Sequence, residues 1–337
     1  MSPTATQTAS PTATLTAARQ LTGLKPTGSL QLGNLLGAIR PLIAAQDRCD
    51  SVVMIVDLHA LTKEHDPRRV RDSTLQAARL LLAAGIDPER TTMFIQSHLA
   101  EHAQLHYLLE CVTGFGEARR MIQFREKSAG PDPVRLSLLT YPVLMAADIL
   151  LHDTDEVPVG EDQSQHLELA RDVAYRFNTR YGQTFNVPRG VNPAFAARIM
   201  DLSEPEAKMG KSNQITSGVI GLLDPPEVVR RKVMRAVTDT RNVVRRDRDR
   251  QPGVTNLLEI YAACTGELNV DFASYGELKA AVADALIATL EPLQRNYSII
   301  EPGAVRAVLR EGALRAQPRA AATLRRATEA IGLITAF

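Results

Sequence analysis

Residues 51–56, which read SVVMIV, decide the fold class of this chain. They form a short apolar run rich in β-branched residues, without polar alternation, which is typical of a strand buried on both faces of a parallel sheet. Asp66 and Pro67 follow as the N-cap and first-turn proline of a predicted helix that ends near Gly85. Residues 91–95 (TTMFI) then predict the next buried strand.

The same alternation of elements extends toward the N-terminus. A short strand is predicted to end at Gly23, and a turn at residues 26–28 leads into a helical pattern. The apolar face of that helix comprises Leu35, Leu36, Ile39, Leu42 and Ile43. Strand, helix, strand, helix, strand in this order predicts a doubly wound, Rossmann-like α/β domain.

A second, all-helical domain is expected near the C-terminus. From about Pro225 the pattern changes to helices alone, rich in Ala, Leu and Arg, and we place the boundary near residues 213–224. The expected domains are therefore an α/β domain at 19–220 and a helical domain at 221–337. Residues 1–18 hold six Thr, two Ser, two Pro and five Ala without a charged side chain, and we expect a disordered tail that is neither a signal nor a transit peptide.

Composition limits the class of protein. The chain has 337 residues, 45% hydrophobic and 23% charged, which excludes collagenous, disulfide-framework and wholly disordered proteins. The net charge is +1, so any nucleic-acid contact requires a local basic patch. Cys49, Cys111 and Cys264 form no CxxC pair, which favours a reducing cytoplasm and argues against structural zinc. No apolar run reaches about 18 residues, so we expect no membrane span.

Two segments have the composition of phosphate-binding loops. Residues 25–34 (KPTGSLQLGN) follow the first strand and lack GxGxxG; Gly33 allows a ligand to approach the helix start and Asn34 adds a donor, although a plain Gly-containing loop explains the same residues. Residues 208–212 (KMGKS) resemble the end of a P-loop, but Pro205 stands where that motif requires glycine. Two lysines three residues apart suit an oligophosphate that gains charge during reaction, and a solvated lysine pair is the alternative.

Histidines and one carboxylate form the remaining candidate sites. His98, His102 and His106 recur at intervals of four, which allows a metal to bridge an adjacent pair but favours a polar helix face, so we expect no protein-bound metal. His59 follows the strand at 51–56 and is expected at the ligand-binding edge of the sheet. Asp148 lies in the apolar stretch 139–151 (LTYPVLMAADILL), where an ionised carboxylate requires a partner. A ligand N–H is one such partner, and a helix cap at the Pro142 kink is the alternative.

A basic segment opens the helical domain. Residues 230–250 hold nine Lys or Arg against three Asp, which suits phosphate contacts, with a solvated helix face as the alternative.

These motifs occur in the order found in one enzyme family. Residues 26–34 resemble the first signature of the class I aminoacyl-tRNA synthetases, and residues 208–212 resemble the second. Between them, residues 139–150 and 157–163 (VPVGEDQ), with 124–128 (FREKS) before and 198–200 (RIM) after, resemble the tryptophanyl-tRNA synthetases of bacteria. The resemblance covers about residues 20–335.

The resemblance implies a cytoplasmic homodimer that joins L-tryptophan to ATP in the presence of Mg²⁺ and passes tryptophan to tRNA(Trp), with no membrane or DNA partner. It implies a helical insertion with the dimer interface at about 102–190, and an anticodon-binding role for residues 221–337. The ATP site would comprise Lys25, Pro26, Thr27, Gly33, Asn34, Gly160, Glu161, Asp162, Ile199, Lys208, Met209, Gly210, Lys211 and Ser212. The tryptophan site would comprise Gly23, His59, Tyr141, Met145, Asp148, Val157, Val159 and Gln163, with Asp148 accepting the indole N–H. Lys127 would join Lys208 and Lys211 at the leaving phosphates, and tRNA would contact Arg230, Arg231, Arg245 and Arg246.

Three positions depart from the usual signatures. Gln31 replaces His or Thr, Lys25 replaces a common Gln, and Gly210 replaces a common Ser, which removes a hydroxyl and loosens the loop. Gly210 is familiar in tyrosyl-tRNA synthetases, the first alternative reading. The second alternative is an auxiliary, synthetase-like protein that binds tryptophan or a partner and charges tRNA weakly.

Overall fold

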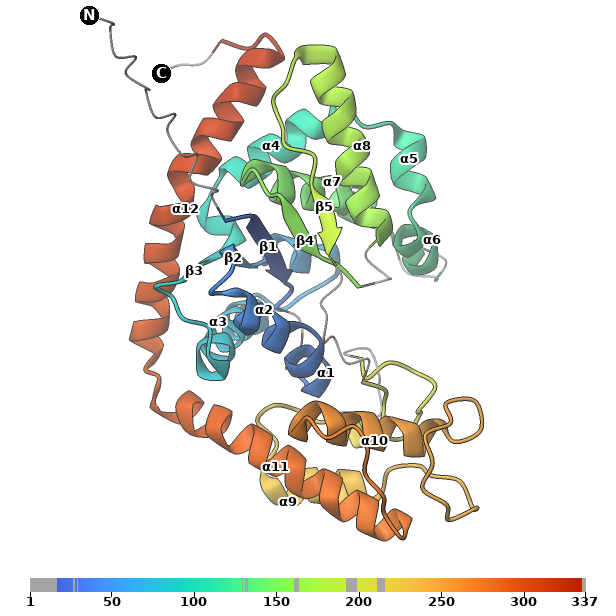
Figure 1. Ribbon diagram of the computed structural model, residues 1–337. Helices are drawn as coiled ribbons and strands as arrows, with labels where there is room; N and C mark the ends of the chain where they lie inside the picture. Colours follow the sequence, from blue (N-terminus) through green and yellow to red (C-terminus); the bar gives the residue numbers. More distant parts are fainter. Residues whose placement is uncertain are drawn as a thin grey trace, which may run out of the picture.

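The computed structural model describes residues 17–26, 28, 30–128, 130, 133–160, 164–191, 199–210 and 216–334, with the side chains of Lys127 and Thr216 excepted. Most of the tail expected to be disordered, residues 1–16, lies outside these ranges. Figure 1 shows a central sheet covered by helices, with a separate group of helices at one end. Within the described residues, no helix combines the length and apolar character needed to cross a membrane.

The sheet is parallel throughout its described part. Its strand order is β3-β2-β1-β4-β5. The strands are β1 (Arg19–Leu24), β2 (Asp50–Ile55), β3 (Thr91–Ile95), β4 (Glu156–Pro158) and β5 (Arg189–Val191). The three predicted strands are confirmed to within one residue at their stated ends, and Val53, Met54 and Ile55 are fully buried, as a strand covered on both faces requires. The chain therefore has the predicted doubly wound α/β fold.

Local signals fix the first two crossover helices. Helix α3 (Pro67–Ala84) begins where the Asp66 side chain accepts a hydrogen bond from the Arg68 N–H at 2.8 Å, and it ends at Gly85, whose φ of +112° is left-handed. After β1, a continuous helical segment comprises α1 (Leu32–Asn34), a π-helical turn η1 (Leu35–Ile39) and α2 (Arg40–Ala45). Of its predicted apolar face, Leu35, Leu36, Ile39 and Leu42 are buried and Ile43 is partly buried.

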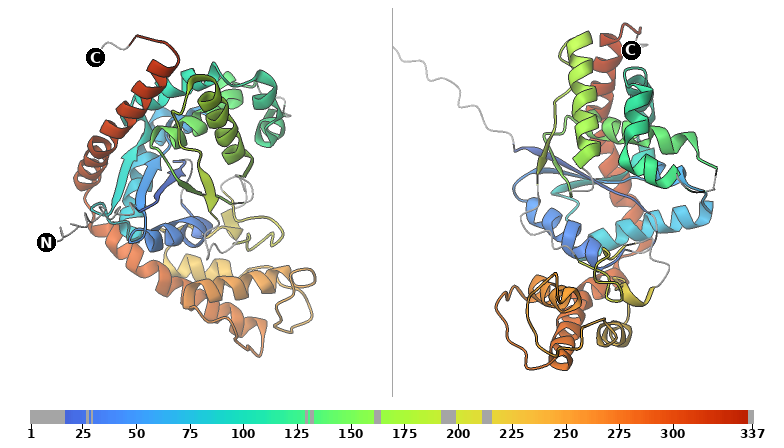
Figure 2. Two further views of the ribbon diagram at one scale, coloured as in Figure 1. Left: turned by 45° about the horizontal axis from the view of Figure 1, so that its top comes forward. Right: turned by 90° about the vertical axis from the view of Figure 1, so that its right-hand side faces the viewer.

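Five further helices gather beside the sheet (Figures 1 and 2). They are α4 (Glu101–Glu110), α5 (Phe115–Arg120), α6 (Ile122–Ser128), α7 (Leu136–Leu151) and α8 (Ser164–Tyr181), with a 3-10 turn η2 (Leu58–Thr62) after β2 and another, η3 (Gln96–His98), after β3. All five lie at or near the range expected for a helical insertion, residues 102–190. That range also contains β4 and most of β5, so the insertion is interrupted by strands of the sheet.

The C-terminal helices divide between two places. Helices α9 (Pro226–Met234), α10 (Pro252–Thr265) and α11 (Tyr275–Ile299) pack together at one end of the molecule, and a 3-10 turn η5 (Thr216–Gly218) precedes them. Helix α12 (Pro302–Ala330) instead returns along β3, the edge strand, as Figure 1 shows. At Gly312 an added Cβ would stand 1.9 Å from the Met93 carbonyl oxygen, so only glycine permits this approach of helix to strand.

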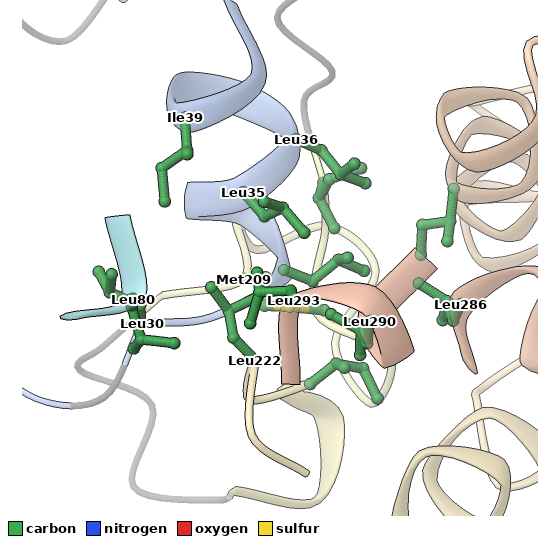
Figure 3. Packing of buried hydrophobic residues seen from close by; sticks show 14 of the residues in the cluster. Leu30, Leu35, Leu36, Ile39, Leu80, Met209, Leu222, Leu286, Leu290 and Leu293 are labelled. Carbon is green, nitrogen blue, oxygen red and sulfur yellow. The ribbon is translucent and has the colours of Figure 1, made fainter. Parts of the chain in front are cut away.

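One hydrophobic cluster joins the sheet to α9–α11. Figure 3 shows Leu30 and Leu35 from the first crossover beside Leu290 and Leu293 of α11, with Met209 between them. The segment at residues 199–210 is therefore anchored at the junction of the two groups of elements.

Candidate active site

The predicted ligand edge of the sheet lies at the carboxyl ends of β1, β2, β3 and β4. Strand β1 is flanked by β2 on one side and β4 on the other: the chain runs outward from β1 through β2 to β3 and then crosses back to β4, so the strand order reverses at β1. Such a reversal opens a crevice at the carboxyl ends of the strands, where doubly wound proteins bind their ligands. Gly23 lies exposed at the end of β1 and Gly160 lies exposed beyond β4, with Val159 half-buried between the strand and Gly160.

Asp148 is held at this edge by three side chains from other elements. Its Oδ1 accepts hydrogen bonds from Gln96 Nε2 and His102 Nδ1, both at 2.7 Å, and its Oδ2 accepts one from His59 Nε2 at 2.8 Å. The residue is 3% exposed and lies inside α7, past the Pro142 position. The helix-cap alternative is therefore wrong, because the carboxylate binds side chains rather than a helix end.

This arrangement keeps Asp148 ionised. Burial alone would raise the pKa of the carboxyl, but the hydrogen bonds and charges of His102 and His59 lower that pKa well below its usual range. A carboxylate offers about four acceptor positions. Among the hydrogen bonds formed by the described residues, Oδ1 takes two and Oδ2 takes one, so Oδ2 retains an acceptor position.

A third histidine, His152, contacts this network through His102. His152 Nε2 lies 3.3 Å from His102 Nε2. Burial and the neighbouring His102 lower the pKa of His152 to about 3, so its imidazole is neutral at pH 7. His102 donates its Nδ1–H to the Asp148 carboxylate, and its Nε2 forms a hydrogen bond with His152 Nε2, so both of its ring nitrogens have partners.

The histidine triplet does not form a common helix face. His98 is an exposed residue of the turn η3, outside α4, and the half-buried His106 pairs with Glu110 at 3.0 Å on α4. His102 alone turns toward Asp148. The polar-face interpretation is therefore wrong for His102, which is buried and contacts Asp148 and His152.

Tyr141 lies about two helical turns before Asp148 on α7. Its hydroxyl donates to Gln123 Oε1 at 3.1 Å and lies 2.8 Å from His166 Nε2. Burial, aided by the charge of Glu126, raises the pKa of Tyr141 to about 12, so the phenol stays protonated. Val157 is buried, while Met145 and Val159 are half-buried against the same apolar cluster; Gln163, Glu161 and Asp162 lie outside the described residues.

The two signature segments are adjacent. Gln31 donates from Nε2 to the Met209 carbonyl, and its own N–H donates to Asn34 Oδ1 at 3.1 Å. An added Cβ at Gly33 would lie 3.5 Å from Gln31 Oε1 and 3.6 Å from the Met209 oxygen. Lys25 Nζ donates to Thr62 Oγ1 at 3.4 Å, and Pro26 is buried, while Thr27 lies outside the described residues.

Residues 199–210 form a short hairpin, the lysine hairpin. Met200 faces Lys208 across an antiparallel bridge flanked by Met209 N–H to Ile199 C=O at 3.1 Å and Asp201 N–H to Ala207 C=O at 2.9 Å. Ile199 and Met209 are buried and anchor the hairpin, while Lys208 is exposed and Gly210 half-exposed near its end. Lys211 and Ser212 lie outside the described residues, as does the side chain of Lys127 on α6.

Comparison with known proteins identifies the family. Residues 15–293 match the family model of class I tRNA synthetases (W and Y). The chain is 56% identical over 329 residues to tryptophan–tRNA ligase 1 of Streptomyces avermitilis, covering 94% of this chain and 99% of that protein. The chain belongs to the tryptophan–tRNA ligase family. It is also similar to the solved tryptophanyl-tRNA synthetase of Mycoplasma pneumoniae, with TM-score 0.89, 38% identity and coverage of 94% and 98% of the two chains.

A second solved member of the tryptophan–tRNA ligase family, from Campylobacter jejuni, was determined in complex with ADP and tryptophan. Its TM-score is 0.81 at 30% identity, covering 94% of this chain and all of that one. The tyrosyl-tRNA synthetase of Archaeoglobus fulgidus is only 22% identical, with TM-score 0.65, and shares the fold alone.

The basic segment of this tryptophan–tRNA ligase family member is mostly irregular. Arg230 and Arg231 lie exposed on α9, where Arg230 pairs with Asp284 at 2.5 Å. Arg245 and Arg246 lie exposed between α9 and α10, where the backbone forms no described helix, and Arg246 donates to the Leu268 carbonyl at 3.3 Å. The alternative of a solvated helix face is therefore wrong for Arg245 and Arg246.

The sequence analysis did not assign three members of the network to Asp148, although it named His102 in the histidine triplet. Gln96, His102 and His152 come from η3, α4 and the end of α7. A signal existed for His102, because it shares the helical spacing of the buried Leu105 and Leu109 and so belongs to the core side of α4. Gln96 and His152 carry no such local signal.

Proposed function

We propose that this chain activates L-tryptophan with ATP and transfers it to tRNA(Trp), with the residues predicted from the signatures forming the two substrate sites. The tryptophan carboxylate attacks the α-phosphorus, the bond to the bridging oxygen breaks, and pyrophosphate leaves. The terminal ribose hydroxyl of tRNA then attacks the acyl carbon and AMP departs. Positioning and charge neutralisation supply most of the acceleration in such a reaction.

The buried, ionised Asp148 is the observation that carries the proposal. Its remaining acceptor position on Oδ2 suits one ligand N–H donor, and the indole ring supplies one. Tyr141 and Gln163 would hold the ammonium group. Val157, Val159 and Met145 would contact the ring, with His59 fixing Asp148 and Gly23 leaving room at the end of β1.

The adjacent signature segments would hold ATP. Lys25, Pro26, Gly33 and Asn34 of the first segment would contact ATP together with the lysine hairpin, and Gly160 would lie at the same site, since it follows β4. By sequence position Thr27, Glu161, Asp162, Lys211 and Ser212, which lie outside the described residues, would join them. Lys127, Lys208 and Lys211 would neutralise the departing phosphates. The described residues here are lysines, amides and glycine rather than grouped carboxylates, so Mg²⁺ would be held chiefly by phosphate oxygens, as this ion commonly is.

The helices beside the sheet would provide a homodimer interface. Phe115, Ile122 and Leu136 are 68%, 54% and 73% exposed on α5, α6 and the start of α7. Large apolar side chains grouped on neighbouring helices typically mark a contact surface. Sedimentation of the parent and of a variant with these three residues changed to Ser tests this assignment, since loss of the dimer is expected.

Helices α9–α11 and the loop before α10 would receive the anticodon, with Arg231, Arg245 and Arg246 on phosphates. The alternative of an auxiliary, synthetase-like protein differs from this proposal in the second step, the transfer of tryptophan to tRNA. Streptomyces avermitilis has two relatives, ligase 1 at 56% and ligase 2 at 47% identity, so paralogues occur within the family. We propose that this chain charges tRNA as well as activating tryptophan, in the cytoplasm of a bacterial cell.

Amino-acid-dependent ATP–pyrophosphate exchange tests the assignment. Tryptophan is expected to support exchange at least 10⁴-fold better than phenylalanine, because phenylalanine leaves the Asp148 acceptor unpaired. Equal exchange with tryptophan and tyrosine would contradict the tryptophan pocket. Charging of tRNA(Trp) is then measured with the same preparation, and activation without charging would support the auxiliary reading.

A further inference from the structure

Asn256 of α10 forms two hydrogen bonds to the backbone of the lysine hairpin. Its Oδ1 accepts the Met200 N–H at 2.9 Å, and its Nδ2 donates to the Met200 carbonyl at 3.0 Å. Both residues are buried, Asn256 with 2% exposure. One amide side chain therefore satisfies both backbone groups of a single residue that lies 56 positions earlier in the chain.

The geometry of the hairpin explains why these groups face outward. Met200 and Lys208 form an antiparallel pair whose flanking residues, 199 with 209 and 201 with 207, exchange the ladder hydrogen bonds. In such a pair the N–H and C=O of Met200 point away from the partner strand. Asn256 thus occupies the outer edge of the strand, and Lys208 lies on its inner edge.

Other contacts attach each side of the hairpin to a different part of the protein. On the helical side, the Val237 N–H donates to the Leu202 carbonyl at 2.8 Å. On the sheet side, Gln31 donates to the Met209 carbonyl. The hairpin is therefore held between the first signature segment and the helices, and Asn256 provides two of the bonds on the helical side.

We propose that Asn256 is a positioning residue for activation, which fixes the Met200 strand and so places Lys208 against the leaving phosphates. This inference rests on the proposed function, in which Lys208 contacts those phosphates. Removing the amide frees the outer edge of the strand and lets the lysine shift. A displacement of about 1 Å can cost about 10²-fold in rate, even when the displaced group is still present.

The test measures ATP–pyrophosphate exchange with Asn256→Ala and with a matched control, Gln294→Ala. Gln294 Nε2 on α11 also donates to two backbone carbonyls, those of Leu222 and Asp224, at 3.0 and 2.9 Å, and both of these residues lie outside the hairpin. We expect Asn256→Ala to lower kcat by 10- to 100-fold with the KM for tryptophan within twofold. Gln294→Ala should keep kcat within threefold at a similar loss of thermal stability.

A double-mutant cycle separates positioning from general support. If Asn256 acts through Lys208, then Asn256→Ala in a Lys208→Ala background should lower kcat by less than threefold. Independent, multiplicative losses would overturn the proposal, as would equal kcat losses in Asn256→Ala and Gln294→Ala. If the alanine variant does not fold, Asn256→Asp replaces it in both measurements, because aspartate still offers an oxygen to the Met200 N–H. A parent without tryptophan-dependent exchange would overturn the proposed function itself, whereas a parent that exchanges beside a fully active Asn256→Ala overturns this inference alone.

Discussion

Changing Asp148 to asparagine tests the tryptophan pocket most directly. Asparagine has nearly the same shape, but one terminal atom becomes an NH₂ group that cannot accept a hydrogen bond. Gln96 and His102 both donate to Oδ1, so the asparagine oxygen will take that place and the NH₂ will replace Oδ2. His59 can accept from that NH₂ through an unprotonated Nε2, so the protein network stays satisfied.

The substitution is therefore expected to weaken tryptophan binding rather than the protein's own hydrogen-bond network. An indole N–H in the proposed pose then faces a donor in place of a carboxylate oxygen. Hydrogen bonds to charged groups contribute about 1.5 to 3 kcal/mol, which corresponds to roughly 10- to 150-fold in affinity. Because Asp148 is 3% exposed, solvent cannot replace the lost acceptor, and the upper part of this range is expected.

The assay is ATP–pyrophosphate exchange with tryptophan and with the analogue in which sulfur replaces the indole N–H. Asp148→Asn should raise the KM for tryptophan by the stated factor, while the KM for the sulfur analogue and for ATP change by less than threefold. The reasoning is refuted if both amino acids lose affinity equally, because the effect would then be a general disturbance of the pocket, or if neither KM changes.

Other residues give further expectations. Lys208→Ala should lower the exchange rate by about 10²-fold with little change in the KM for ATP, since its charge is needed as the phosphates depart; a change in KM alone would show uniform binding. Changing Arg245 and Arg246 together to Ala should weaken tRNA binding and reduce its salt slope by about two, with tryptophan activation intact as the control. The pKa of His152 is about 3 in the folded protein and 6.5 ordinarily, so the unfolded chain binds an extra proton between those values and stability falls as pH decreases. Between pH 7.5 and pH 5, the free energy of unfolding measured in urea should fall by about 2 kcal/mol less in the His152→Phe variant than in the parent. An equal fall in both proteins would contradict the assigned pKa.

The central strands and the first crossover helices could be predicted from local sequence. Strand β2 has an uninterrupted apolar run because both its faces are covered, and Asp66 and Gly85 mark the ends of α3 through their own backbone requirements. Strands β4 and β5 have three residues each, too few to show any period. The charged residues between α9 and α10 are compatible with a helix in sequence. The structure has no helix there: Asn242 has a left-handed φ of +52°, and the chain does not continue α9.

The site could be predicted only in part for a different reason. Asp148 could be singled out because its charge conflicts with an apolar helix, a conflict visible within one segment. Its partners His59, His102 and Gln96 lie 89, 46 and 52 residues away and meet it only through the packing of α7 against the ends of the strands. The role of Asn256 could not be predicted from sequence either, because it depends on which edge of the hairpin faces α10.

The path of α12 has a consequence for how the chain is made. Helix α12 covers β3, an edge of the sheet, and reaches it through Gly312, 217 residues after the end of β3 at Ile95. A ribosome that adds about 5 to 20 residues per second needs roughly 10 to 45 s for that interval. Throughout this time the nascent sheet presents an uncovered strand edge, which is a template for pairing with another nascent chain. Chains released before residue 312 are therefore expected to aggregate, and chaperones should engage this protein during synthesis until its last helix emerges.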